Sequence, residues 1–308
     1  MNLLVTGACG HIGSYLIHNI DKISKVSNVF LIDNFISEKV SSLFKIKTKK
    51  KLYFFLRDLK NSDALKDLKK IDIVIHLASM TNAAGSFNNK KEMFENNLKC
   101  FHNVFKFCIK NKSKLIHISS TSIYGKSSGV VKENVEKKYL KPQSPYAEIK
   151  LKEEKILKKN SKKIKFSTFR FGTIAGPSRG MRFHTAVNSF CLMASINDYI
   201  KVYKTATNQY RPYLSIRDSF KLFKFCIENN FFTNDAYNAL SGNYTVSEIL
   251  KIIKKYKKNI KIKTINSPIM NQLSYHVDKT KLKKSGLMLN SKLDLDIKNT
   301  IKLLSYLK

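Results

Sequence analysis

The sequence predicts an α/β protein with a doubly wound parallel sheet and a smaller C-terminal α/β lobe. Two observations predict this fold. Apolar runs of strand length alternate with helix-length segments through the first half of the chain, and a glycine-rich turn directly follows the first run. The composition agrees, because 43% of the 308 residues are hydrophobic and only 5 are proline, which excludes a disordered or collagen-like chain.

Six apolar runs predict the strands of the sheet. They cover residues 3–6, 29–32, 52–56, 71–76, 114–119 and 165–170. Apolar residues at helical spacing predict helices over 90–111 and 145–159. Beyond Gly176 the alternation weakens and a smaller α/β region follows. Its helices are expected at 185–195, 215–228, 245–256 and 294–307.

The chain carries a net charge of +35, from 57 basic and 22 acidic residues. Such a charge could indicate nucleic acid or acidic lipid as a partner, since clustered cations bind polyanions. Only six of the basic residues are arginine, however, and lysine occurs on nearly every presumed solvent face. We therefore interpret the charge as a solvated basic surface and expect no nucleic-acid partner.

Signals for membrane insertion, secretion and metal binding are missing from the sequence. Every apolar run is shorter than the roughly 18 residues that span a bilayer, and the N-terminus has no basic segment ahead of its short apolar run. The five cysteines form neither a CxxC pair nor a zinc-like cluster with histidine. We expect a cytoplasmic protein with reduced thiols, no metal and no membrane contact.

The glycine-rich turn is the sequence Thr-Gly-Ala-Cys-Gly-His-Ile-Gly at residues 6–13, between the first strand and the first helix. A turn of this kind lets the backbone approach a pyrophosphate, whose charge the start of the following helix stabilises. Gly7 would form the turn, Gly10 the close approach and Gly13 the contact between helix and sheet. These features are typical of the cofactor site of a Rossmann-type domain.

Two carboxylates after later strands extend this site. Asp33 lies 20 residues beyond Gly13, at the end of the second strand. A carboxylate there accepts both ribose hydroxyls and repels a 2′-phosphate, which selects NAD over NADP. Asp58 follows the third strand and could accept from the adenine amino group. The alternatives are a loop residue for Asp33 and a helix cap for Asp58.

A tyrosine and a lysine lie one helical turn apart, at Tyr146 and Lys150. A neighbouring ammonium favours the phenolate form, so that the tyrosine can exchange a proton with a substrate hydroxyl. Ser120 follows the fifth strand, at the edge of the sheet where ligands bind, and would hydrogen-bond the reacting oxygen.

A series of motifs along the chain resembles the extended short-chain dehydrogenase/reductases, specifically the NAD-dependent epimerase/dehydratase family that acts on nucleotide sugars. The motifs cover nearly the whole chain and include TGACGHIG, LIDN, RDL, HLAS, NNLKCFHNV, SSTSIYG, SPYAEIK, RFGTIAGP and RPYLSIRD. The resemblance implies an NAD-binding Rossmann domain over 1–175, to which part of 213–240 returns. A substrate-binding lobe would cover 176–308.

The resemblance also implies roles for individual residues. Tyr146 would be the acid/base, Lys150 a ribose contact that tunes it, Ser120 the residue that orients the hydroxyl, and Asn97 a supporting polar group. The implied cofactor-binding residues are Gly7, Gly10, His11, Ile12, Gly13, Asp33, Asn34, Asp58, Leu59, Leu77, Ala78, Ser79, Asn97, Tyr146 and Lys150. The implied substrate-binding residues are Thr81, Ser120, Thr173, Asn188 and Arg211.

The distribution of arginine supports a phosphate ligand in the second half of the chain. Five of the six arginines fall within the 48 positions from 170 to 217. A guanidinium binds phosphate in a bidentate way, which lysine cannot imitate. We expect Arg211 to bind the substrate diphosphate and Arg170, at a strand end, to be structural.

Departures from the family pattern narrow the reaction. The family's 4,6-dehydratases carry an Asp-Glu pair directly after the hydroxyl residue, whereas this chain has Thr121 and Ser122. Dehydration is therefore disfavoured, and the resemblance implies epimerisation of a nucleotide sugar through a keto-sugar. Thr173 replaces the usual asparagine, and 270–278 contains no second phosphate-binding arginine.

Two alternative functions remain beside this one. A reductase or dehydrogenase of a keto-sugar nucleotide would use the same catalytic residues, and a catalytically silent NAD-binding protein with a basic interaction surface would keep only the cofactor site. The resemblance further implies a homodimer packed through the helices at 90–111 and 145–159, and a role in surface polysaccharide or glycoconjugate synthesis.

Overall fold

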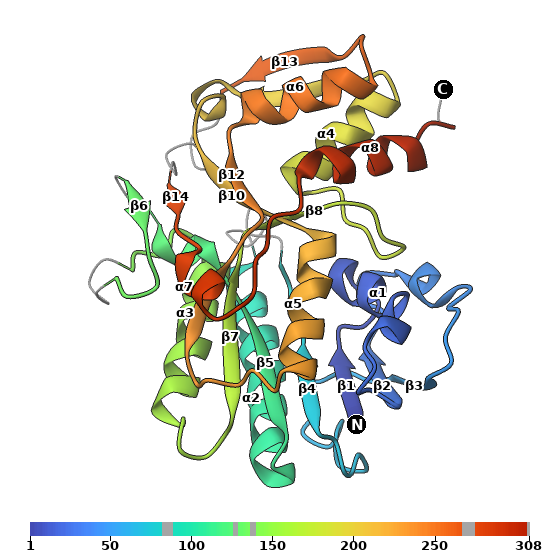
Figure 1. Ribbon diagram of the computed structural model, residues 1–308, viewed down its shortest axis with the longest axis vertical. Coiled ribbons are helices and arrows are strands. Elements are labelled where there is room, and N and C mark those ends of the chain that lie inside the picture. The colour runs from blue at the N-terminus through green and yellow to red at the C-terminus, as the bar shows by residue number, and fades with distance from the viewer. Residues whose placement is uncertain (82–88, 126–128, 136–139, 267–274, 307–308) are drawn as a thin grey trace.

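The computed structural model describes residues 1–81, 89–125, 129–135, 140–266 and 275–306. A large sheet with helices on both faces forms the lower part of the molecule in Figure 1, and a smaller group of helices and strands lies above it. The doubly wound α/β fold is confirmed.

The large sheet has seven strands, all parallel, in the order β11-β7-β5-β4-β1-β2-β3. Six of them match the predicted apolar runs. The strands are β1 (Asn2–Thr6), β2 (Asn28–Asp33), β3 (Lys51–Leu56), β4 (Ile73–His76), β5 (Lys114–Ser120), β7 (Phe166–Phe171) and β11 (Ala236–Ala239). The strand order reverses between β1 and β4, and ligands of open α/β sheets bind at such a point.

Alternate side chains of the central strands enter different cores. In β1, Leu3 and Val5 belong to the core that includes Leu222 and Phe223, whereas Leu4 belongs to the core that includes Phe101. The first core lies under α1 (His11–Ile17) and α5 (Ile216–Glu228), and the second under α2 (Lys90–Asn111) and α3 (Pro145–Lys159). The sheet is thus covered on both faces, which explains its continuous apolar runs.

The start of α3 follows from its sequence. The side chain of Ser144 accepts a hydrogen bond of 3.2 Å from the Ala147 backbone, and Pro145 occupies the first turn, where it costs no hydrogen bond. This cap places Tyr146 in the first turn of the helix. The predicted helices at 90–111 and 145–159 agree with α2 and α3.

In the described residues, the smaller part of the molecule contains two small sheets and three helices. A three-stranded sheet has the order β12-β10-β8, and β9 pairs with β13. A short pair, β6 with β14, and a one-turn helix, α7, lie beside the large sheet (Figure 1). The elements are β6 (Val130–Val131), β8 (Thr173–Ala175), β9 (Tyr199–Tyr203), β10 (Arg211–Ser215), β12 (Gly242–Tyr244), β13 (Lys261–Ile265), β14 (His276–Val277), α4 (Ala186–Ser195), α6 (Val246–Tyr256), α7 (Thr280–Lys284) and α8 (Leu293–Leu303).

Short 3₁₀ helices complete the described elements. They are η1 (Ile20–Lys22), η2 (Val40–Leu43), η4 (Thr121–Tyr124) and η6 (Lys204–Ala206). The helix expected over 294–307 ends at Leu303 in the structure, and 307 lies outside the described residues.

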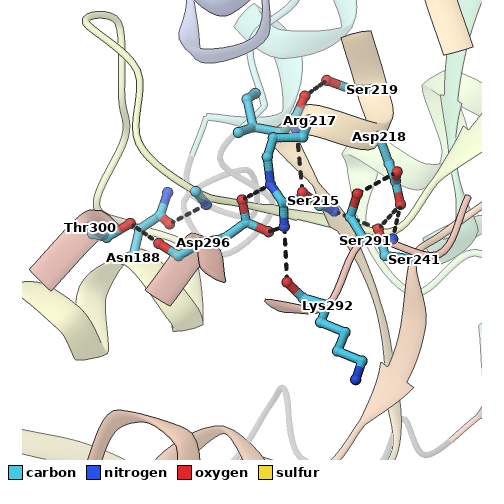
Figure 2. A network of polar contacts seen from close by, with 12 residues as sticks. Asn188, Ser215, Arg217, Asp218, Ser219, Ser241, Ser291, Lys292, Asp296 and Thr300 are labelled. Atoms are coloured by element: carbon cyan, nitrogen blue, oxygen red, sulfur yellow. Dashed lines mark hydrogen bonds and ion pairs between the residues drawn. The ribbon is translucent and has the colours of Figure 1, made fainter. Parts of the chain in front are cut away.

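A polar network ties α8 to the N-terminus of α5 (Figure 2). The guanidinium of Arg217 donates to Asp296 at 3.0 Å and to the Lys292 carbonyl at 2.9 Å. Asp218 accepts from the hydroxyl of Ser241 at 2.6 Å and from that of Ser291 at 2.7 Å. One arginine of the cluster around 170–217 is therefore used to hold α8 against the start of α5.

Among the described residues, none of the helices is both long enough and apolar enough to cross a membrane.

Candidate active site

A cavity of about 450 Å³ lies at the carboxyl ends of β1, β2 and β4. The predicted residues that line it are Gly7, Gly10, His11, Ile12, Gly13, Asp33, Asn34, Asp58, Leu59, Leu77, Ala78, Ser79 and Thr81. They come from the glycine-rich turn, the ends of the second and third strands and the segment after β4. The fold therefore gathers at one edge most of the residues that the sequence assigns to a cofactor.

The glycine-rich turn has no room for side chains at two of its positions. A Cβ atom on Gly7, whose φ is +66°, would lie 2.6 Å from the Ala78 backbone nitrogen. A Cβ atom on Gly13 would lie 2.5 Å from the Ala8 carbonyl oxygen. The turn thus fits directly against the segment after β4, as a dinucleotide site requires. These residues fit NAD.

The carboxylate of Asp33 lies at the end of β2 and is 9% exposed. It accepts 2.9 Å hydrogen bonds from the backbone amides of Cys9 and Phe35. Each carboxylate oxygen can still accept another hydrogen bond, so Asp33 remains able to bind a ribose. Asp58 also lines the cavity, and it accepts from the Lys60 amide at 2.9 Å in the manner of a cap.

Four basic side chains to which the sequence assigned no binding role also line the cavity, namely Lys39, Arg57, Arg182 and His184. Arg182 donates a 2.5 Å hydrogen bond to the hydroxyl of Thr81, and its buried Nε has no partner among the described residues. Burial lowers the pKa of Arg182, while nearby Tyr146 raises it. The clustering of arginines in the sequence was the one signal that pointed to Arg182, and no feature of the sequence pointed to Lys39.

His11 links the glycine-rich turn to the end of β8. Its Nε2 lies 2.8 Å from the Gly176 carbonyl oxygen, while its buried Nδ1 has no partner among the described residues. Burial and the nearby charge of Arg182 lower the pKa of His11 to about 3. The imidazole is therefore neutral at physiological pH and can serve as a donor to the carbonyl.

The catalytic candidates come from two neighbouring elements. Ser120 ends β5 and caps η4, where its hydroxyl accepts from the amide and the hydroxyl of Ser122 at 3.2 and 2.8 Å. Tyr146 and Lys150 lie on α3, which packs against β5 and η4. The Lys150 ammonium is 5.9 Å from the centre of the Tyr146 ring. It also hydrogen-bonds Glu153, which the sequence did not single out.

Two predicted asparagines hold loops of the site by their amide groups. Asn97 accepts from the amide of Met80 at 2.8 Å and donates to its carbonyl at 3.0 Å. Asn188 accepts from the Gly176 amide at 3.2 Å and donates to the Arg182 carbonyl at 3.0 Å. Both side chains are buried, so in this structure they shape the segments around the cavity.

The remaining substrate candidates lie away from the described cavity. Thr173 begins β8 and pairs with Tyr213, and Arg211 begins β10 and hydrogen-bonds Tyr275. Of the segment 270–278, the part up to 274 lies outside the described residues. Arg170 forms a bidentate pair with Glu154 at 3.0 and 2.8 Å, a structural contact.

The residues after Ser120 supply no carboxylate to the site. Thr121 donates to the Phe171 carbonyl at 3.2 Å, and Ser122 donates to Ser120. Among the described residues, no group of three or more histidines, cysteines or carboxylates is arranged to hold a metal ion.

Comparison with known proteins shows the family of this chain. The model of the NAD dependent epimerase/dehydratase family matches residues 3–239. An uncharacterized UDP-glucose epimerase, YtcB, from Bacillus subtilis (strain 168) is 32% identical over 198 residues, 61% of this chain and 61% of that protein. A dTDP-D-glucose 4,6-dehydratase from Dictyostelium discoideum is 29% identical over 195 residues, 58% of this chain and 44% of that protein. The matched part thus spans less than two thirds of the length of these two relatives.

Solved structures share the fold over the whole chain. The crystal structure of UDP-glucuronic acid 4-epimerase from Bacillus cereus, in complex with UDP-glucuronic acid and NAD, superposes with a TM-score of 0.88. It covers 100% of both chains at 23% sequence identity. At this identity the likeness establishes the fold.

Proposed function

Because the chain belongs to the NAD dependent epimerase/dehydratase family, we propose that it is an NAD-dependent epimerase of a nucleotide-activated sugar. The observation that carries the proposal is the placement of Ser120, Tyr146 and Lys150 on β5 and α3, two elements that pack against each other. The absence of an acid pair at Thr121 and Ser122 favours epimerisation over dehydration, since eliminating water requires a further acid and base.

The cofactor would lie in the cavity of about 450 Å³, with its phosphates against the glycine-rich turn and its ribose hydroxyls on Asp33. Arg182 and Lys39 also line this cavity and supply positive charge to it. When bound, NAD supplies a reversible acceptor for the hydride of the sugar carbon.

The side chains of this protein handle the proton of the reaction. Tyr146 accepts the proton of the sugar hydroxyl as that carbon is oxidised to a ketone, and it returns the proton when the ketone is reduced from the opposite face. Lys150 stabilises the phenolate during this cycle, and Ser120 donates a hydrogen bond to the reacting oxygen. Protons and electrons balance over the cycle, so an epimerase consumes no cofactor.

A panel of UDP-, GDP- and dTDP-sugars tests this proposal. The purified protein is incubated with NAD and each sugar, the product is identified by NMR, and the cofactor redox state is followed by absorbance. Inversion of one sugar without net NADH supports the epimerase. A stoichiometric change in NADH would instead establish the reductase or dehydrogenase.

The Tyr146→Phe variant tests the residue assignment in the same assay. It should lose turnover by about 100-fold or more, because only the ionisable oxygen is removed, and it should still bind NAD. Tyr53→Phe is the matched control, since Tyr53 is 43% exposed on β3 and the substitution makes the same chemical change outside the site. Full activity of Tyr146→Phe would remove the tyrosine from the mechanism.

We also propose a homodimer packed through α2 and α3, and a role of the sugar product in surface polysaccharide or glycoconjugate synthesis. The two helices pack side by side, as a two-helix interface requires. Sedimentation of the purified protein would reveal the dimer. A cytoplasmic location is proposed from the five cysteines, all of which are free and buried.

A further inference from the structure

Three buried side chains, Lys150, Glu153 and His117, form a polar cluster between α3 and β5. The side chains of Lys150, Glu153 and His117 are only 3%, 1% and 0% exposed. The Lys150 ammonium donates to Oε2 of Glu153 at 2.8 Å. The same oxygen lies 2.9 Å from Nε2 of His117, and Nδ1 of His117 lies 3.2 Å from the Thr168 hydroxyl.

These contacts join three elements. Lys150 and Glu153 are three residues apart on α3 and lie on the same face of the helix, which here is turned toward the sheet. His117 is in the middle of β5, and Thr168 lies opposite it on β7. The imidazole is held on both sides, so its Nε2–H points at the carboxylate in one fixed orientation.

Burial disfavours the charged form of Lys150, and Glu153 counteracts this effect. An isolated ammonium in a protein interior tends to lose its proton, because the charged form is poorly solvated there. Burial is the largest single influence on the pKa of Lys150 and lowers it, but the charge and the hydrogen bond of Glu153, together with the nearby Tyr146 and Glu154, raise the pKa above its ordinary value. Burial likewise favours a neutral Glu153, yet Lys150 and His117 lower its pKa to about 2.

We propose that Glu153, oriented by His117, is a positioning residue that keeps the Lys150 ammonium charged and fixed beside Tyr146. This inference rests on the proposed function, because it gives Glu153 its role through the tyrosine and lysine of that reaction. Glu153 touches neither cofactor nor substrate in this scheme. It acts on the chemistry only through Lys150.

Charged and titratable groups from all the packed elements face this centre. Two of these groups lie on α3, two imidazoles lie on the sheet, and a thiol and an imidazole lie on α2. The groups are Tyr146, Glu154, His76, His117, Cys100 and His102. Glu153 is the largest electrostatic influence that raises the pKa of Lys150.

The geometry favours a fixed charge over a path for protons. His117 is 0% exposed and Thr168 is 1% exposed, so the contacts beyond Glu153 lead into the interior of the sheet. A proton passed in this direction would reach no solvent. The group therefore holds the ammonium in place.

The first experiment measures the charge of Lys150 without substrate. Lysines are labelled with ¹³C at Cε, and the NMR signal of Lys150 is identified by its loss in Lys150→Met. In Glu153→Gln this signal should titrate at a pH lower by about 1–3 units than in the parent protein, because the neutral amide no longer compensates the buried ammonium.

The second experiment measures the reaction. In Glu153→Gln the kcat at neutral pH should fall about tenfold or more, with KM nearly unchanged, and the alkaline limb of the pH–rate profile should move to lower pH. Glu153→Asp keeps the charge and should restore part of both effects. It also provides a test if Glu153→Gln does not fold.

Glu154→Gln is the matched control. It removes a carboxylate from the adjacent position of the same helix, where the ion-pair partner is Arg170. It should lower stability while shifting the Lys150 titration much less than Glu153→Gln does.

Two outcomes would overturn the inference. An unchanged Lys150 titration in Glu153→Gln would show that the carboxylate does not maintain the charge. A shifted titration with unchanged kcat and pH profile would show that the charge does not serve the reaction. If no sugar of the panel reacts with the parent protein, the proposed function fails, while the NMR titration still decides whether Glu153 holds the charge.

Discussion

At the residue scale, Arg182 is the clearest addition that the structure makes to the site. Its guanidinium lines the cavity, donates to Thr81, and forms no ion pair among the residues that the structure describes. Leaving a partly buried guanidinium without an anion costs free energy, so a ligand phosphate is a suitable partner. We propose that a phosphate of bound NAD pairs with Arg182.

We predict that Arg182→Gln weakens NAD binding about tenfold to a hundredfold, the effect of losing a hydrogen bond from a charged group. Isothermal titration calorimetry at two salt concentrations measures it, and the salt dependence should become shallower in the variant. Arg179→Gln is the control, because Arg179 belongs to the same segment but is exposed. Equal NAD affinity of the parent and Arg182→Gln would contradict the assignment.

Asn97 and Asn188 show how a polar side chain can shape a site through the backbone that it holds. Each uses its amide to fix the backbone at Met80 or at Gly176 and Arg182. The sequence predicts both as binding residues, and that part stays a prediction. These hydrogen bonds hold the backbone at Met80, Gly176 and Arg182 in one conformation beside the cavity.

At the element scale, the glycine-rich turn depends on close packing that the spacing of its glycines only suggests. Gly7 and Gly13 lie where a Cβ atom would press on backbone atoms, whereas one on Gly10 would lie 3.3 Å from the Gly7 carbonyl. The backbone of a turn or strand cannot move aside as a flexible side chain can. Substitution at Gly13 must therefore displace the turn or α1.

We predict that Gly13→Ala costs about 1–3 kcal/mol of NAD binding free energy, because the new methyl group forces the turn away from its packed position. NAD titration measures the loss. Gly286→Ala is the control: Gly286 has a φ of +92° and its Cβ would meet no atom closer than 4.0 Å. That control should lose stability through backbone strain and keep its NAD affinity. An unaltered affinity in Gly13→Ala would refute the packing argument.

The helix α3 combines two kinds of information. Its start is local, since Ser144 and Pro145 define the first turn and so the place of Tyr146. Its buried face is not local, because only contact with β5 turns Glu153 inward onto His117. In sequence, Lys150 and Glu153 resemble an ordinary surface pair three residues apart.

At the scale of the whole molecule, buried neutral histidines make stability depend on pH. Burial, with the charge of Arg182 near His11 and of Lys150 near His76, lowers the pKa of each imidazole to about 3. An unfolded chain binds these protons near pH 6.5. The unfolded state therefore holds more protons below that pH, and stability is lost as the pH falls from about 6.5 toward 3.

We predict that, as the pH falls from 6 to 5, protonation of each of these two histidines in the unfolded chain lowers the free energy of unfolding by about 1.4 kcal/mol. Urea unfolding at fixed ionic strength measures the slope. His11→Phe removes one titrating group and should reduce the slope by that amount. A slope identical to that of the parent would mean that His11 is protonated in the folded protein.

Hydrophobic periodicity is a local property, so the order of most strands and helices along the chain can be predicted from the amino-acid sequence. Six strands of the large sheet and the helices α2 and α3 follow from it, and so do the residue types at the glycine-rich turn, Ser120, Tyr146 and Lys150. The seventh strand, β11, was missed as a strand, because its sequence Ala-Tyr-Asn-Ala has no apolar run.

Which polar groups are buried together follows from the packing of elements that lie far apart in the sequence. Arg182 reaches Thr81 across 101 positions of the chain, and His117 reaches Glu153 across 36. The guanidinium of Arg217 is paired with Asp296, 79 positions away, and is therefore not a candidate for binding phosphate. Such contacts depend on how complete elements pack, and the free energy of a buried charge depends on its surroundings in space. No local pattern of residues contains that information.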